Sequence, residues 1–331
     1  MESRARMTKQ DSAFLHSFVL DGKGYGQAVD ATAIRQWSPE DGVLWIHFDA
    51  SDPLAARWLA NESGLPDVAR DVLLAGETRP RSLVTDAGML TVLRGVNLNP
   101  GADPEDMVSV RVWIEEHRII SSRRRRLLSV SDLSEALRAG TGPTTSGHFL
   151  VALIERLADR IGGFVDAIED RMDAAEDEIS SGKQAGFRQR LSALRRQIAE
   201  VRRFLAPQRD ALDRLTRQTS TWLTETDAHG LRQESDRITR FLEDLDLAKE
   251  RAIVLQEELL SLIAQEQNAR MYVLSVVAAI FLPLTFVTGL LGMNVGGLPG
   301  IDSPGGFMWS IIVMLVAAVA LAVFFRWKRW L

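Results

Sequence analysis

Two long apolar runs lie near the C-terminal end of the chain. Residues 271–291 read MYVLSVVAAIFLPLTFVTGLL and residues 307–325 read FMWSIIVMLVAAVALAVFF, and neither run carries a charged side chain. At ~1.5 Å per residue, a helix of this length covers the ~30 Å hydrocarbon core of a bilayer. A buried helix of a soluble domain is the alternative interpretation. Two such runs joined by a short loop favour a pair of transmembrane helices.

A second apolar pattern, with helical spacing, precedes the first of these runs. No Gly or Pro interrupts residues 231–270. Steps of three, four and seven residues, typical of a coiled-coil-like helix, relate Ile238, Leu242, Leu245, Ala252, Leu259 and Leu262. Because nothing ends this helix before the apolar run, we expect a stalk helix over 231–270 that continues into the membrane. From residue 234 to 291 it would be roughly 87 Å long.

The first 140 residues alternate between strand-like and helical patterns. The runs GVLWIHFDA, SLVTDAGMLTVLRGVNL and MVSVRVWIEEHRIISS have the β-branched and aromatic content of strands, and DPLAARWLANESG has helical spacing. This pattern predicts an α/β domain over 1–140. The segment GTGPTTSG then marks a loop, and we expect a helical region over 141–230.

The positive charges around the apolar runs predict the orientation of the chain. Arg270 precedes the first run, and Arg326, Lys328 and Arg329 follow the second, whereas the joining loop 292–306 has no Lys or Arg. The positive-inside rule then places both termini and the α/β domain in the cytoplasm, and the loop 292–306 outside, in the periplasm. The second span ends in a basic cytoplasmic tail, 326–331.

The composition excludes several kinds of site. With 39 Lys+Arg and 44 Asp+Glu, the net charge is -5, which argues against a nucleic-acid partner because phosphate contacts need a basic surface. The chain has no cysteine, so disulfides and thiolate metal ligands are excluded. Its five histidines lack the spacing of a zinc motif. We expect no resident cofactor.

Three groupings in the soluble part allow both a functional and a plainly structural interpretation. His47 and Asp49 could form a catalytic or metal-binding pair, although any strand places residues two apart on one face. The basic run 123–126 is either a motif for nucleic acid or anionic lipid, or a solvated strand end. A cluster of carboxylates is either a solvated helix face or an acidic collar that concentrates cations, and it comprises Glu169, Asp170, Asp173, Glu176 and Asp177.

One face of the first apolar run collects small and polar side chains. Continuing the stalk spacing into the run relates the residues that we call the pore stripe: Asn268, Met271, Ser275, Ala278, Leu282 and Thr285. Amide and hydroxyl groups on one stripe would line something other than lipid, although Ser275 and Thr285 could simply hydrogen-bond their own helix. A chain with two spans cannot enclose a pore, so several copies around an axis would each contribute this helix.

The outer end of this helix carries groups suited to a cation. Gly289 and Gly292 permit close backbone approach, and the helix end frees carbonyl oxygens. Asn294 would add a ring of amide oxygens, where we expect a hydrated cation to be held. Asp302 is the only charged residue of the outer loop, and it either attracts cations or forms a turn.

Two C-terminal spans behind a stalk helix and an α/β domain, with the first span ending in Gly292, Met293 and Asn294, resemble the CorA family of divalent-cation transporters. The resemblance covers essentially the whole chain. The segments GMNVGGLPG, ETRPR, MVSVRVW, GTGPT and APQRD resemble the ZntB zinc-transporter branch of that family. The resemblance implies a funnel-shaped homopentamer in the bacterial inner membrane. In it, Gly292, Met293 and Asn294 would form the selectivity filter, and Asn268, Met271, Leu282 and Thr285 would face the axis.

The resemblance also implies a cargo, Zn²⁺, taken up with or without coupling to protons. It leaves open a Mg²⁺ or Co²⁺ channel and zinc efflux. Two other classes of function stay open at this point. A membrane-anchored coiled-coil signalling protein would need no pore stripe, and a membrane-tethered hydrolase would use His47 and Asp49 but lacks a nucleophile elbow or phosphate loop.

Overall fold

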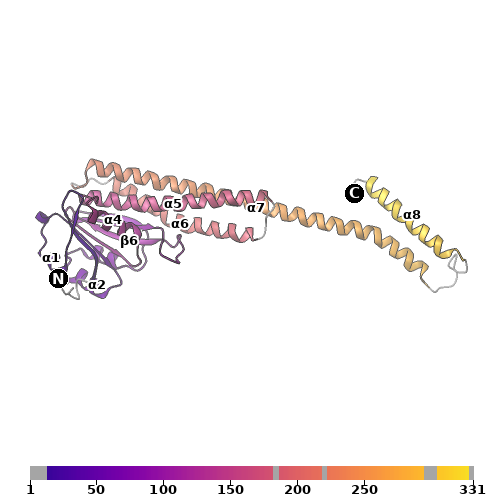
Figure 1. Ribbon diagram of the computed structural model, residues 1–331, viewed down its shortest axis with the longest axis horizontal. Helices are drawn as coiled ribbons and strands as arrows, with labels where there is room; N and C mark the ends of the chain where they lie inside the picture. The colour runs from indigo at the N-terminus through magenta and orange to yellow at the C-terminus, as the bar shows by residue number, and fades with distance from the viewer. Residues whose placement is uncertain (1–12, 182–185, 218–221, 294–303, 328–331) are drawn as a thin grey trace. The chain divides into compact units, whose positions relative to one another are not determined.

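The computed structural model describes residues 13–181, 186–217, 222–293 and 304–327. The chain divides into two compact units, Met1–Gln256 and Glu257–Leu331. The first unit contains a β-sheet and a group of long helices (Figure 1). The second contains the C-terminal part of helix α7 and the last helix, α8.

A seven-stranded mixed sheet forms the N-terminal part of the first unit, with the strand order β2-β1-β3-β7-β6-β5-β4. β3 and β7 are parallel, and the other neighbouring strands are antiparallel. The edge strand β4 alternates between exposed and partly buried side chains, whereas β5 and β6 are buried almost throughout. The strands are β1 Phe14–Leu20, β2 Gly26–Ala28, β3 Val43–Asp49, β4 Arg81–Thr85, β5 Gly88–Gly95, β6 Val108–Ile114 and β7 Arg118–Arg123.

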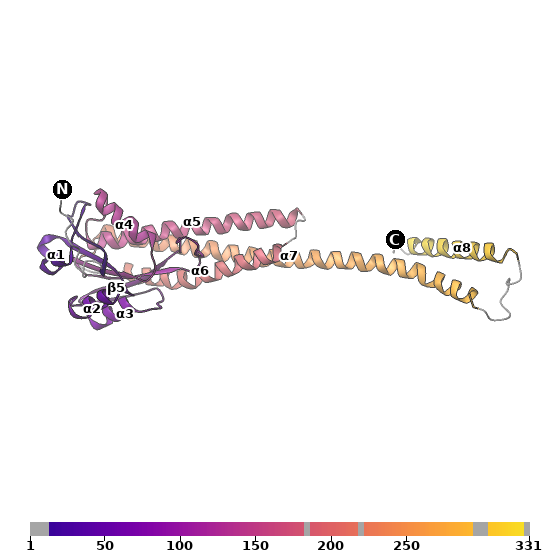
Figure 2. The same ribbon diagram turned by 60° about the horizontal axis from the view of Figure 1, so that its bottom comes forward.

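Alternate side chains of β3 contact helices on opposite faces of the sheet. Ile46 and Phe48 belong to a buried cluster that includes Leu59 of α2 (Pro53–Asn61) and residues of α3 (Asp67–Leu74). The ring of Trp45 points the other way and lies 4.9 Å from that of Phe149 in α5. Figure 2 shows α2 and α3 on one side of the sheet and α4 and α5 on the other. A strand covered on both faces has a continuous apolar sequence, which explains the run GVLWIHFDA.

Long helices make up the rest of the first unit. Figures 1 and 2 both show α5, α6 and the N-terminal part of α7 side by side. The helices of this unit are α1 Ala31–Gln36, α2, α3, α4 Leu128–Ala139, α5 Ser146–Ser180, α6 Phe187–Thr216 and the beginning of α7 Glu225–Leu291. The apolar stalk pattern is buried here, at Leu231, Ile238, Leu242, Leu245 and Ala252. An ion pair between Arg237 and Asp159, at 2.7 Å, also joins α7 to α5.

Helix α7 begins upstream of the predicted stalk and passes through Gly230 without a break. A Cβ atom at Gly230 would lie 2.7 Å from Cγ1 of Val151 in α5. The glycine therefore permits close packing of two helices, although its low helix propensity alone suggests a helix end.

The second unit is a pair of apolar helices. α7 continues through the first predicted span to Leu291, and α8 (Gly306–Trp327) covers the second. Each contains a window that is long and apolar enough to cross a membrane. Both views show α8 running back alongside the C-terminal part of α7 (Figures 1 and 2).

Candidate functional site

The pore stripe lies on the exposed part of α7 in the second unit, which also carries apolar side chains such as Leu274 and Phe281. Its members are all exposed in the single chain: Asn268, Met271, Ser275, Ala278, Leu282 and Thr285. The apolar side chains of Met271 and Leu282 are 66% and 72% exposed. Side chains of this size are left uncovered only where lipid or another polypeptide surrounds them.

The opposite face of α7 is partly buried. At about 100° per residue, its centre lies roughly 150° around the helix from the pore stripe. It consists of Val276, Ala279, Ile280, Leu284 and Val287, all of intermediate exposure. On α8, reduced exposure recurs with the same spacing at Met314, Ala317, Leu321 and Phe325. These rows of reduced exposure indicate that the two helices face each other on a side of α7 away from the pore stripe.

The hydroxyl groups of the stripe bond to their own helix. Ser275 Oγ donates to the carbonyl of Met271, and Thr285 Oγ1 donates to that of Phe281, both at 2.8 Å. The sequence allowed this interpretation, in which Ser275 and Thr285 bond to the backbone of their own helix. These bonds use the hydroxyl hydrogens, so the oxygen lone pairs remain available to a cation or its water.

The first span ends at the predicted selectivity filter. The N–H of Gly292 donates to the carbonyl of Thr288 at 2.9 Å and closes the last turn of α7. A Cβ atom at Gly292 would lie 3.0 Å from that same oxygen, which favours glycine. Helix geometry leaves the carbonyls after Thr288 without intrahelical partners. Asn294 and Asp302 lie outside the described residues.

The acidic cluster of α5 is partly neutralised by α7. Arg251 donates from Nε to Glu176 at 2.7 Å and from Nη2 to Asp173 at 2.5 Å, and these bonds raise the pKa of Arg251. The pKa of Glu169 is also raised, first by burial and then by neighbouring carboxylates. Asp170 and Asp177 are exposed. The cluster therefore combines a structural ion pair with a solvated acidic face.

Helix α5 offers no preformed metal site. Within the ranges that the structure describes, no three His, Cys, Asp or Glu side chains are grouped so that they could hold a metal ion. The acidic collar thus stays a prediction about long-range attraction of cations rather than direct coordination.

His47 and Asp49 are not brought together as a reactive pair. His47 is fully buried, and its Nδ1 lies 2.9 Å from Ser121 Oγ on β7. Asp49 accepts a hydrogen bond from the N–H of Ser51 in the following turn, at 2.8 Å. His47 and Ser121 are both buried, at 0% and 2% exposure, so this hydrogen-bonded pair is closed to a substrate. The imidazole instead belongs to a buried stack in which the rings of His16 and His47 lie 5.8 Å apart.

The basic run 123–126 bonds to nearby parts of the first unit. Arg124 donates to the carbonyl of Leu74 at 2.8 Å, at the end of α3. Arg125 forms an ion pair with Asp106. The side chains near the end of β7 therefore serve the fold and a pocket beside it, rather than an open basic surface.

Comparison with known proteins decides the family. The family model described as CorA-like Mg2+ transporter protein matches residues 40–329. The chain belongs to this CorA-like family. The divalent cation transporter CmaX of Pseudomonas aeruginosa is 43% identical over 325 residues, which are 97% of this chain and 98% of CmaX. The zinc transport protein ZntB of Pectobacterium atrosepticum is 35% identical over 331 residues, which are 100% of both chains.

Solved structures confirm the fold class of this CorA-family chain. The full-length structure of CmaX has a TM-score of 0.84 and 41% identity, and the match covers 96% of this chain and 98% of CmaX. The CorA magnesium transporter from Methanocaldococcus jannaschii has a TM-score of 0.81 at 18% identity, over 96% and 99% of the two chains, and shows the shared fold. The relatives are transporters, so the chain is a membrane transport protein and not an enzyme.

The buried imidazoles predict a loss of stability in acid. Burial, and to a lesser degree Arg138 and Arg123, lowers the pKa of His16 from 6.5 to about 4. The unfolded chain therefore takes up this proton at a higher pH than the folded chain does. The contribution of neutral His16 to the free energy of unfolding is fully present above pH 6.5 and is lost as the pH falls towards 4. The pKa of His47 is shifted in the same direction, mainly by burial.

We expect the thermal unfolding midpoint of His16→Gln to fall less between pH 7 and pH 5 than that of the unmodified chain. His229→Gln, at an exposed position, is the control and should keep the full pH dependence. Identical pH dependence in all three proteins would mean that His16 is not the titrating group.

Proposed function

We propose that this CorA-family divalent-cation transporter carries Zn²⁺ across the bacterial inner membrane, through a pore on the axis of a homopentamer. The observation that carries the proposal is the pore stripe of α7, which holds amide and hydroxyl groups on a face that α8 leaves exposed. In a ring of copies, this face would meet the axis while apolar side chains faced α8 and lipid. The face that is costly to expose to lipid would then contact water and ions.

Zinc is the proposed cargo because the chain is similar to a zinc transport protein over its full length. The ligand chemistry constrains how the ion would pass. Zinc prefers nitrogen and sulfur ligands at closed sites, whereas the pore stripe offers amide and hydroxyl oxygens and the sulfur of Met271. We therefore propose that Zn²⁺ keeps its water shell and that Asn294, with the carbonyls around Gly292 and Met293, binds that shell.

We propose uptake as the direction of transport, which is what the resemblance to the ZntB branch implies. Cations would be drawn to the pore by Asp302 on the outside and by the exposed carboxylates of α5, such as Asp170 and Asp177, in the cytoplasm. The spans 271–291 and 307–325 contain no acidic, basic or histidine side chain. Coupling to protons would therefore have to run through water in the pore.

A Mg²⁺ or Co²⁺ channel is the second candidate function. Oxygen ligands and a retained water shell suit Mg²⁺, and CmaX is named only for divalent cations. Transport assays with both ions separate the two candidates.

Asn294→Ala should reduce ⁶⁵Zn²⁺ uptake into proteoliposomes about tenfold, the loss expected when one hydrogen-bonding group of about 1.4 kcal/mol is removed. Asn294→Asp should bind Zn²⁺ more tightly and also transport it more slowly, because a carboxylate ring retards release. Size-exclusion chromatography of both variants checks that assembly is unchanged.

Uptake by Asn294→Ala at the unmodified rate would mean that the motif only caps the helix. Unlabelled Mg²⁺ added as a competitor tests the cargo. Strong competition by Mg²⁺ at concentrations equal to Zn²⁺ would favour the second candidate.

The proposed topology places both termini in the cytoplasm and the loop 292–306 outside. In the cysteine-free chain, Ser303→Cys should react with an impermeant thiol reagent on intact cells. Glu258→Cys, at an exposed position of α7, should react only after the cells are permeabilised. If only Glu258→Cys were labelled on intact cells, the orientation of the chain in the membrane would be the opposite of the one we propose.

A further inference from the structure

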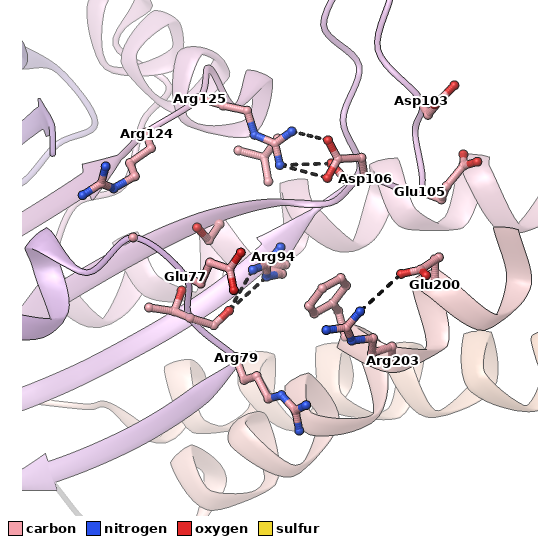
Figure 3. A pocket seen from close by; sticks show the side chains of 15 residues that line it. Glu77, Arg79, Arg94, Asp103, Glu105, Asp106, Arg124, Arg125, Glu200 and Arg203 are labelled. Carbon is pink, nitrogen blue, oxygen red and sulfur yellow. Dashed lines mark hydrogen bonds and ion pairs between the residues drawn. The ribbon is translucent and has the colours of Figure 1, made fainter. Parts of the chain in front are cut away.

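The first unit contains a pocket of ≈ 850 Å³ that the transport pathway does not use. Its walls come from the segment 76–79 after α3, the residues 103–109 leading into β6, the end of β7, and α6 at 200–204. Figure 3 shows several guanidinium groups around the pocket, with carboxylates placed among and beside them. A pocket of this size is in the range that holds a small organic ligand and is far larger than one inorganic ion.

Two arginines of the pocket are held by backbone carbonyls instead of carboxylates. Arg94 donates to the carbonyls of Thr78 and Met107 at 2.8 and 2.7 Å, and its guanidinium lies 3.9 Å from the ring centre of Phe204. Arg124 donates to the carbonyl of Leu74 at 2.8 Å. Neither has a carboxylate at ion-pair distance within the described part of the chain. Glu77 and Asp106 offset part of the charge of Arg94 from beyond that distance, whereas Arg124 keeps its positive charge.

Arg111 adds a third such charge directly behind the wall. It is fully buried, and its Nη2 donates to the carbonyls of Ala75 and Gly76 at 2.7 and 3.0 Å. Its Nε and Nη1 are buried and have no partner among the described residues, and the same holds for Thr78 Oγ1. Burial, followed by repulsion from Arg124 and Arg94, lowers the pKa of Arg111 to about 10. Unpaired buried cations are costly, so an anion nearby would be stabilised.

Five carboxylates line the pocket together with five arginines, and Glu77 is the carboxylate that lies next to Arg94. Asp106 is paired with Arg125, and Glu200 lies 3.7 Å from Arg203. Asp103 and Glu105 line the pocket from the segment before β6, and in Figure 3 they lie apart from Arg124 and Arg94. They would repel an anion from that side and direct its charged end towards the arginines.

We propose that this pocket binds a phosphate-bearing anion of nucleotide size, with its phosphate groups against Arg94, Arg124 and Arg79. Guanidinium forks match phosphate oxygens in pairs and lose little entropy on binding. These three binding groups come from the sheet and the segments that adjoin it, and Arg203 and Phe204 of α6 also line the pocket. The inference does not depend on which ion the protein transports. The proposal also gives a role to two residues of the basic run 123–126, because Arg124 and Arg125 line the pocket.

The test measures binding by isothermal titration calorimetry on the purified full chain, at ionic strength kept constant with NaCl. The probes are orthophosphate, pyrophosphate and ATP. We expect ATP and pyrophosphate to bind, with ATP the tighter, and orthophosphate to bind more weakly than either. Absence of binding by ATP and pyrophosphate, or orthophosphate binding as tightly as ATP, would overturn the proposal.

Variants at exposed positions locate the site, and the thermal unfolding midpoint of each variant checks that the fold is kept. Arg79→Gln and Arg124→Gln should each weaken ATP binding about tenfold, and Arg124→Lys should retain part of the affinity because it keeps the charge. Arg126→Gln is the matched control, since Arg126 is exposed beside the pocket but does not line it. An unchanged affinity in Arg79→Gln and Arg124→Gln, or an equal loss in Arg126→Gln, would place the anion elsewhere.

Discussion

The structure depends on one constraint: polar side chains within a bilayer need a partner other than lipid. Helix α7 meets this constraint by separating its two faces. Val276, Ile280 and Leu284 lie on the face that packs with α8, whereas Asn268, Ser275 and Thr285 lie on the face that α8 leaves uncovered. A single chain cannot cover that second face. The hydroxyl hydrogens of Ser275 and Thr285 already bond to their own helix. Assembly around an axis, as we propose, would bring water and ions to the lone pairs that remain on these oxygens.

The cytoplasmic part of α7 is held by a different set of interactions. Its apolar side chains are buried in the first unit, and Arg251 binds Asp173 and Glu176 of α5. These contacts fix the rotation of α7 about its own axis within that unit. Because α7 is one continuous helix from Glu225 to Leu291, the helix held by these contacts is the same one that carries the pore stripe.

Local patterns in the sequence were sufficient to predict the two spans, the stalk and the sheet. The uncharged runs and the apolar steps from Ile238 to Leu245 are properties of single segments, so no long-range information is needed. The strand order could not be predicted, since it depends on the parallel pairing of β3 with β7. Gly230 resembled a helix end because its contact with Val151 is not visible in the sequence.

Some functional residues could be predicted from local sequence patterns, and others could not. The pore stripe follows from helical spacing, and the structure describes all of it, whereas Asn294 and Asp302 lie outside the described residues. The pairing of the acidic cluster with Arg251 joins residues far apart in the chain and has no local signal. The arginine pocket was missed as a site. The sequence gives one signal for this pocket: Arg94 and Arg111 each stand within an apolar strand pattern. A charged residue is rarely placed inside a buried strand unless a partner or a ligand stabilises its charge.

The central claim is that the exposed face of α7 lines the path of the ion, and two adjacent alanines test it directly. Ala278 belongs to the pore stripe, and Ala279 belongs to the partly buried face. In the cysteine-free chain, each is replaced by cysteine, and ⁶⁵Zn²⁺ uptake into proteoliposomes is measured before and after a small water-soluble thiol reagent is added. Our account predicts that the reagent blocks uptake by Ala278→Cys and leaves uptake by Ala279→Cys unchanged. Block of Ala279→Cys with no effect on Ala278→Cys would contradict it.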